Sequence, residues 1–151
     1  MNNLIRLQDG QARIDAADAW QLGEGDGPRI LPLAQWRADN GLLLSPEDDV
    51  ESLQLSFAEL ALIAIDFPSF RDGRGYSQAY LLRRRLGWQG ELRAVGDVLR
   101  DQLSHMRQCG FDSFAVREDK SVEDALKGLA GMSVLYGRSA IEPRPLYRRR
   151  S

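Results

Sequence analysis

Cysteine and histidine are almost absent from this 151-residue sequence, which contains one of each. A single thiol, Cys109, excludes an internal disulfide and any zinc or iron–sulfur site built from several thiolates of the chain. We interpret Cys109 as a small buried residue, because its one candidate histidine partner, His105, lies four positions upstream on the same predicted helix. His105 has no accompanying nucleophile and no metal-ligand spacing, which favours a surface or boundary histidine. The sequence therefore predicts no metal site.

Long apolar segments and a strong net charge are also missing. The longest apolar run, residues 60–65, is too short to cross a membrane, and residues 1–9 lack the basic and apolar regions of a signal peptide. The formal net charge is -2, which gives no overall attraction to nucleic acid or to an anionic membrane. We therefore expect a cytoplasmic protein without a nucleic-acid or membrane partner.

The sequence lacks both common nucleotide-binding signatures. Gly73-Arg74-Gly75 has no third glycine at the dinucleotide spacing, and no Gly-Lys-Ser/Thr phosphate loop occurs. From these absences we predict that the chain carries no cofactor.

What is present is the composition of an ordinary globular domain, with 43% hydrophobic and 28% charged residues. Residues 1–44 are predicted to form a β-rich subregion. Two short segments, 4–7 and 12–15, flank a Gln-Asp-Gly turn signal and predict a β-hairpin. An extended segment at 29–32 and a short helix from Leu33 to about Asn40 are expected to follow.

Residues 45–140 show alternating strand and helix patterns, and residues 141–151 are predicted to be an extended basic tail. A helix is expected from Ser45 through Phe57, where Ser45 can cap, Pro46 suits the first turn and apolar residues recur at helical spacing. Three strand–helix units should then follow, with strands at 60–66, 91–95 and 111–116 and helices at 76–86, at 97–109 and from residue 121 onward. Short connections between such units imply parallel strands, so we predict an α/β fold of three or so parallel βα units, either a half-barrel or a small open sheet.

The carboxyl ends of parallel strands are where ligands gather, which directs attention to the loops at 66–77, 96–102 and 117–120. Arginines beside a helix start can hold an anion, and carboxylates can act as bases. Such an arrangement can equally lock loops together by ion pairs. The candidate ligand- or partner-binding residues are Asp66, Arg71, Asp72, Arg74, Tyr76, Asp97, Arg100, Asp101 and Gln102.

The same region resembles a bacterial family called domain of unknown function 934, whose members are often labelled as oxidoreductases of sulfite reduction. The resemblance covers roughly residues 45–118 and rests on the runs 65–68, 70–77, 81–83, 90–103 and 109–112. It implies a role beside assimilatory sulfite reductase, the enzyme that reduces sulfite with sirohaem and an iron–sulfur cluster. Because this chain lacks cofactor signatures, any part in redox chemistry would be that of an accessory to a cofactor-bearing enzyme.

Three hypotheses follow. The first is an accessory protein that binds sulfite reductase through the Arg71–Tyr76 loop and the Asp97–Gln102 segment. The second is a small enzyme that clamps an anionic substrate with Arg71 and Arg74 and uses Asp66, Asp97 or Asp101 as a base. The third is a structural or oligomerisation module. The sequence leaves the oligomeric state open.

Overall fold

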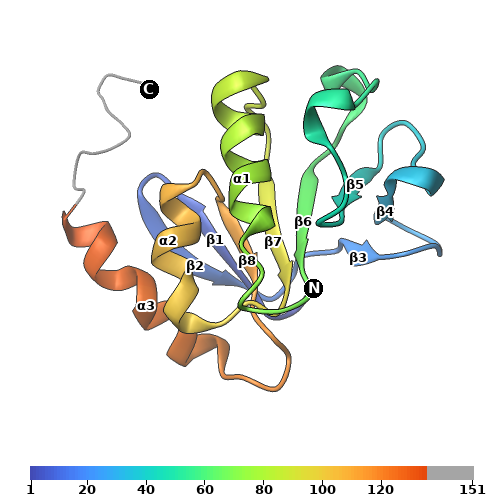
Figure 1. The fold of residues 1–151 in the computed structure, drawn as a ribbon. Coiled ribbons are helices and arrows are strands. Elements are labelled where there is room, and N and C mark those ends of the chain that lie inside the picture. Colours follow the sequence, from blue (N-terminus) through green and yellow to red (C-terminus); the bar gives the residue numbers. More distant parts are fainter. Residues whose placement is uncertain (136–151) are drawn as a thin grey trace.

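A curled eight-stranded sheet, shaped like half a barrel, forms the body of the protein (Figure 1). The computed structural model describes residues 1–135, with side chains up to residue 129. The strands are β1 (Leu4–Gln8), β2 (Gln11–Asp15), β3 (Gln21–Leu22), β4 (Arg29–Pro32), β5 (Gly41–Leu44), β6 (Ile63–Phe67), β7 (Leu92–Gly96) and β8 (Ser113–Ala115). Their order across the sheet is β2-β1-β8-β7-β6-β5-β4-β3. Three helices, α1 (Arg74–Tyr80), α2 (Leu103–Gln108) and α3 (Val122–Leu135), connect or follow β6 to β8.

The predicted N-terminal hairpin is confirmed. β1 and β2 pair antiparallel from Leu4↔Asp15 to Gln8↔Gln11. Asp9 and Gly10 form the turn with φ of 53° and 79°, and two successive positive values are typical of the type I′ turn that suits strand twist. The hairpin then joins the main sheet, because β1 also pairs antiparallel with β8.

The sheet has more parallel strands than the three or so that the sequence predicted. Every neighbouring pair from β3 to β8 is parallel. The α/β class and the parallel units around β6, β7 and β8 are confirmed, but β3, β4 and β5 extend the sheet without α-helices between them. Their connections at 23–28 and 33–40 contain at most a 3-10 turn, at Leu33–Gln35, where a short helix was expected. Parallel neighbours usually need a longer crossover, so these segments resembled loops.

The prediction of a helix from Ser45 through Phe57 is wrong. The segment contains turns and two 3-10 turns, Val50–Ser52 and Phe57–Glu59. Asp48 Oδ2 accepts the Ser45 N–H at 2.8 Å, and Asp49 Oδ1 accepts the Glu51 N–H at 3.0 Å. Asp49 thus takes the Glu51 N–H, a backbone donor that a continuous helix would bond to the carbonyl of residue 47.

The helix predicted from Asp97 to Cys109 begins later than expected, with a 3-10 turn at Arg100–Gln102 that leads into α2. The helix predicted from Tyr76 to Leu86 starts earlier, at Arg74, and continues after Tyr80 as a π-helical turn, Leu81–Arg85. Arg83 in this turn donates to the carbonyls of Gly110, Trp88 and Gly90 at 2.8–2.9 Å. The wider turn therefore positions a guanidinium that satisfies three loop carbonyls.

The curl of the sheet follows from its connectivity. β2 and β3 lie at opposite edges of the eight strands, yet only residues 16–20 connect them. The chain from residue 15 to residue 21 spans at most about 20 Å. In a flat sheet with strands about 4.8 Å apart, the outer strands would lie about 34 Å apart. The sheet must therefore curl so that this segment can cross its inner face.

The two faces of the sheet are covered differently. The helices pack on the outer face over Ile63, Ile65 and Phe67 of β6 and their neighbours. Gly75 of α1 lies so close to this face that an added Cβ would come 2.7 Å from the Phe67 ring. The inner face holds a smaller apolar cluster around Leu4, Ile30, Ala64 and Val95, with Met1 and Trp20 packed against it.

Two stretches assigned from the sequence extend beyond the described residues. The predicted basic tail at 141–151, and the end of the 45–140 region, lie outside the described residues. None of the helices within residues 1–135 has the length and apolarity required to cross a lipid bilayer.

Candidate functional site

The predicted loops meet at the carboxyl ends of β6, β7 and β8, where Phe70 is held by its backbone. Asp97 Oδ2 accepts the Phe70 N–H at 2.7 Å, and Gln102 Nε2 donates to the Phe70 carbonyl at 2.8 Å. Gln102 is itself fixed, because its Oε1 accepts the Leu99 N–H at 3.1 Å. Asp97 and Gln102 of the second loop thus hold both the backbone N–H and the carbonyl of Phe70 in the first loop.

Asp97 links this contact to the third loop. Its Oδ1 accepts a hydrogen bond from Arg117 Nη1 at 2.7 Å, while Arg117 Nε and Nη2 donate to Asp119 at 2.9 and 2.6 Å. The hydrogen bond from Arg117 lowers the pKa of Asp97, and the two carboxylates raise the pKa of Arg117. Arg117 therefore joins two loops and is neutralised by two carboxylates.

Asp72 and Arg74 form a local pair on the exposed side of the first loop. Asp72 accepts from the backbone N–H of Arg74 at 3.0 Å and from its Nε and Nη2 at 3.1 and 2.7 Å. These hydrogen bonds lower the pKa of Asp72 to about 2. Arg74 also lies 3.6 Å from Glu47. The guanidinium that was expected to clamp an anion is therefore already paired with carboxylates.

Asp66 differs from Asp72 and Asp97, the rim carboxylates that are paired with arginines. It is half-buried on β6, and its carboxyl group makes no hydrogen bond or ion pair with the residues that the structure describes. Burial raises its pKa, and the negative charges of Asp72 and Glu47 add to the shift. A carboxyl group of this kind accepts protons more readily than an ordinary aspartate, which is common at functional sites.

Tyr76 lies under the rim between aromatic rings. Its ring centroid is 5.1 Å from that of Phe67 and 4.4 Å from that of His105. Burial raises the pKa of Tyr76, and the hydrogen bond with Gln102 opposes that shift. Exposed His105 thus packs against the Tyr76 ring at a tilt. Half-buried Cys109 borders the core, and burial raises the pKa of its thiol.

Three predicted residues are not part of this connected group. Arg71 is exposed and its guanidinium lies 5.4 Å from the centre of the Phe70 ring. Arg100 donates to Asp124 of α3 at 3.1 Å, and Asp101 lines a small hollow between this turn and α3. The structure therefore connects Asp97, Gln102 and Tyr76. The Asp72–Arg74 pair is a local contact of the first loop, and Asp66 is close enough to Asp72 for their charges to interact.

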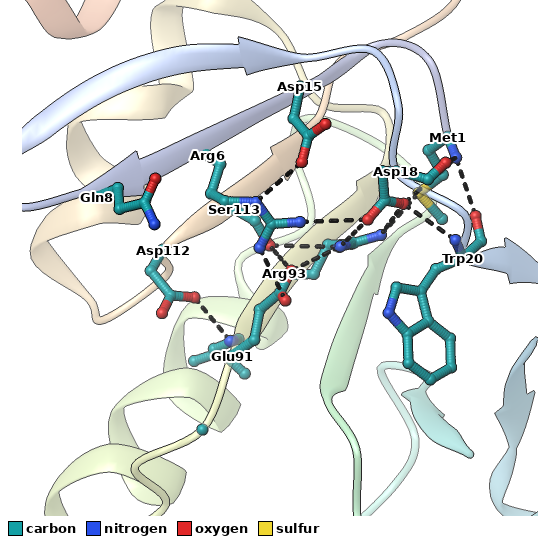
Figure 2. A network of polar contacts seen from close by, with 12 residues as sticks. Met1, Arg6, Gln8, Asp15, Asp18, Trp20, Glu91, Arg93, Asp112 and Ser113 are labelled. Atoms are coloured by element: carbon teal, nitrogen blue, oxygen red, sulfur yellow. Dashed lines mark hydrogen bonds and ion pairs between the residues drawn. The ribbon is translucent and has the colours of Figure 1, made fainter. Parts of the chain in front are cut away.

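A second polar cluster, which the sequence reading missed, lies on the inner face of the sheet (Figure 2). Arg93 of β7 is fully buried and donates to both carboxylate oxygens of Asp18 at 2.9 Å. It also donates to Glu91 Oε2 at 2.6 and 3.0 Å. Arg6 donates to Asp15, Asp18 and Glu91 at 3.0–3.2 Å, and Ser113 Oγ donates to Glu91 at 2.7 Å.

This cluster fastens the segment that crosses the inner face. Burial alone would raise the pKa values of Asp18 and Glu91, but hydrogen bonds and charge from Arg93 outweigh it, and both pKa values are lowered. The available signal was an arginine within the buried strand Leu92–Gly96, because a charge in such a position must be paired. Its main partner is 75 positions away, so the sequence could not identify it.

A hollow of about 810 Å³ opens on the inner face next to the rim. It is lined by residues 1–3 and 115–119, by Ala16 and Asp18, by Gln21 and Leu22 of β3, and by Gly96. Its volume lies within the usual range of small-molecule sites, about 300–1,000 Å³. The hollow therefore combines a suitable size with a position at the carboxyl ends of β7 and β8.

Comparisons with known proteins identify a family but no characterised relative. A family model described as "Bacterial protein of unknown function (DUF934)" matches residues 41–147, which covers the rim and all three helices. No curated protein and no solved structure matches the chain.

Proposed function

The chain belongs to the bacterial family of unknown function DUF934, and on this premise we propose that it is an accessory protein of assimilatory sulfite reduction. It binds a sirohaem and iron–sulfur sulfite reductase through the rim and carries no redox cofactor of its own. The link to sulfite reduction rests on the resemblance described above. The geometry of the rim supports recognition of a protein partner.

The observation that carries this proposal is the presentation of Phe70. Its side chain is 49% exposed, although its backbone is held on both sides by Asp97 and Gln102. Arg71 lies over the same ring. Aromatic and arginine side chains dominate the binding energy of many protein interfaces, and a fixed backbone reduces the entropy lost on binding.

The pairing of the rim charges also favours recognition of a protein. Arg74 is bound by Asp72, and Arg117 by Asp97 and Asp119, so neither guanidinium is free to clamp a small anion. Such pairs fix the shape of the three loops. A rigid rim with one exposed aromatic residue resembles a docking surface more than an anion site.

The test is binding of purified sulfite reductase to the immobilised full-length chain. We expect the Phe70→Ala/Arg71→Ala variant to weaken binding at least about tenfold, as for a central interface pair. A matched control is Tyr80→Ala/Arg84→Ala, because Tyr80 is 52% exposed and Arg84 lies 5.4 Å from its ring, away from the rim. The proposal is wrong if the wild-type chain does not bind the reductase, or if both variants bind equally well.

Asp66 favours a second candidate function, an enzyme that acts on a small anion. Its unpaired carboxyl group could serve as a general base at the end of β6. This function requires Arg74 to exchange Asp72 for the substrate. Isothermal titration with sodium sulfite tests it: saturable heat that Arg74→Ala abolishes supports the enzyme, whereas the absence of heat excludes sulfite as its substrate.

A further inference from the structure

Gly96 adjoins both the inner-face hollow and the unpaired Asp66 carboxyl group. Gly96 lines the hollow. A Cβ added to Gly96 would come 2.6 Å from Asp66 Oδ1 and 2.5 Å from the Phe67 carbonyl oxygen. The absence of a side chain at position 96 therefore leaves the Asp66 carboxylate at the border of the hollow.

The position of Asp66 matches that of ligand-binding residues in barrel-like sheets. In register, Asp66 pairs with Val95 of β7, whose side chain belongs to the inner-face cluster. Parallel neighbours share a face, so Asp66 lies on the inner face as well. It is the last inner-face residue of β6 before the rim, where strand ends supply the functional side chains of parallel barrels.

The charge of the hollow determines the kind of ligand that fits it. Two cationic groups line the hollow, the Met1 ammonium and the Arg117 guanidinium. The ammonium is paired with Asp18, and the guanidinium is paired with Asp97 and Asp119. Glu118, also in the lining, is exposed and adds a carboxylate, and Asp66 adds another at the border. The surroundings of the hollow are thus net negative and offer hydrogen-bond acceptors.

We propose that this hollow is a binding site for a small organic cation, whose ammonium group donates hydrogen bonds to Asp66. A half-buried carboxylate without a protein partner gains the most from a ligand that supplies both positive charge and donors. The same carboxylates disfavour the binding of anions in this hollow. Phe70 and Arg71 do not line the hollow, so the proposed ligand and the proposed protein partner contact different residues.

Nuclear magnetic resonance titration of the full-length chain tests the proposal, with putrescine dihydrochloride as the cationic probe and sodium sulfate as the anionic one. Putrescine should shift the amide signals of Gly96 and Arg117 saturably, and sulfate should not. Asp66→Asn should raise the putrescine Kd at least about tenfold, the effect of losing a charged hydrogen bond. This variant should fold, because the Asp66 carboxyl group makes no hydrogen bond within the described chain.

Glu59→Gln provides the matched control. Glu59 is an exposed carboxylate that precedes β6, so the variant removes the same charge at the opposite end of the strand. Its putrescine Kd should stay within about twofold of the wild-type value, since distant surface charges are screened. Saturable shifts with sulfate, no shifts with putrescine, or equal losses in both variants would each overturn the proposal. The Phe70→Ala/Arg71→Ala variant should bind putrescine with the wild-type Kd, because neither residue lines the hollow, which separates this site from the docking residues.

Discussion

Replacement of Arg93 by methionine should destabilise the protein severely. Methionine fills similar volume, so the change mainly removes the charge and the hydrogen bonds. The Arg93 side chain is fully buried, and the Asp18 side chain is 3% exposed. Water therefore cannot replace the hydrogen bonds that the Asp18 carboxylate loses in the variant. Breaking one side of a buried ion pair costs about 3–5 kcal/mol. Because Arg6 and the Met1 ammonium still contact Asp18, we expect about 3 kcal/mol.

Urea unfolding at pH 7 measures this loss directly, and thermal unfolding should show a midpoint lower by about 6–12 °C for a domain of this size. Arg37→Met is the control. Arg37 contacts Glu24 at 3.2 Å, but both side chains are more than half exposed. Surface pairs of this kind contribute little, so the control should lose no more than about 0.5 kcal/mol.

The pH dependence gives a second, stricter test. In the folded wild type, the pKa values of Asp18 and Glu91 lie below their ordinary values of 3.8 and 4.5. Their contribution to stability is therefore present above pH 4.5 and is lost as the pH falls through the lowered values. In Arg93→Met, Asp18 and Glu91 are buried carboxylates with too few partners, and protonation removes their unfavourable charge. The difference in unfolding free energy between wild type and variant should therefore narrow as the pH falls. A variant as stable as wild type at pH 7 would refute the reasoning, and so would a difference in unfolding free energy that widens in acid.

Three further predictions concern the rim and its support. Gly75→Ala should cost about 1–3 kcal/mol in urea unfolding, because its Cβ meets the Phe67 ring, whereas Gly73→Ala has open space and should cost little. Asp97→Asn should accelerate hydrogen exchange at the Phe70 amide without changing exchange in β1, and equal exchange rates would contradict its role in holding the loop. Asp66→Asn should raise the thermal midpoint at pH 7, because the raised pKa of Asp66 means that its charged form opposes folding. That gain should vanish below pH 3.8, where the carboxyl group is protonated in both folded and unfolded chains.

The sequence predicted those parts of the fold that depend on local pattern. The turn at Asp9 and Gly10 defined the hairpin, and the apolar run before Asp66 defined β6. Because β6, β7 and β8 are parallel, their following loops had to share an edge. This explains why Asp97 and Gln102 do contact Phe70, although they are far from it in the sequence.

The features that the sequence could not supply depend on distant pairing. Arg93 contacts Asp18 only because residues 16–20 cross the inner face, and that crossing exists only because β2 and β3 take opposite edges. The segment from Ser45 to Phe57 was predicted wrongly for a local reason, not because of distant pairing. Its apolar spacing suited a helix, but the backbone N–H groups of Ser45 and Glu51 donate to Asp48 and Asp49 in local turns instead.

The contrast between the inner-face carboxylates argues that Asp66 is retained for binding. Asp18 and Glu91 are paired with arginines, and their pKa values are lowered. Asp66 lies on the same face without such a partner, and its pKa is raised, so its charge opposes folding. A neutral side chain at position 66 would serve the fold better, and natural proteins break such rules mainly at functional sites. If stability alone governed this position, Asp66→Asn would stabilise the protein and leave its binding of small cations unaltered; the proposed site requires the gain in stability to come with a loss of binding.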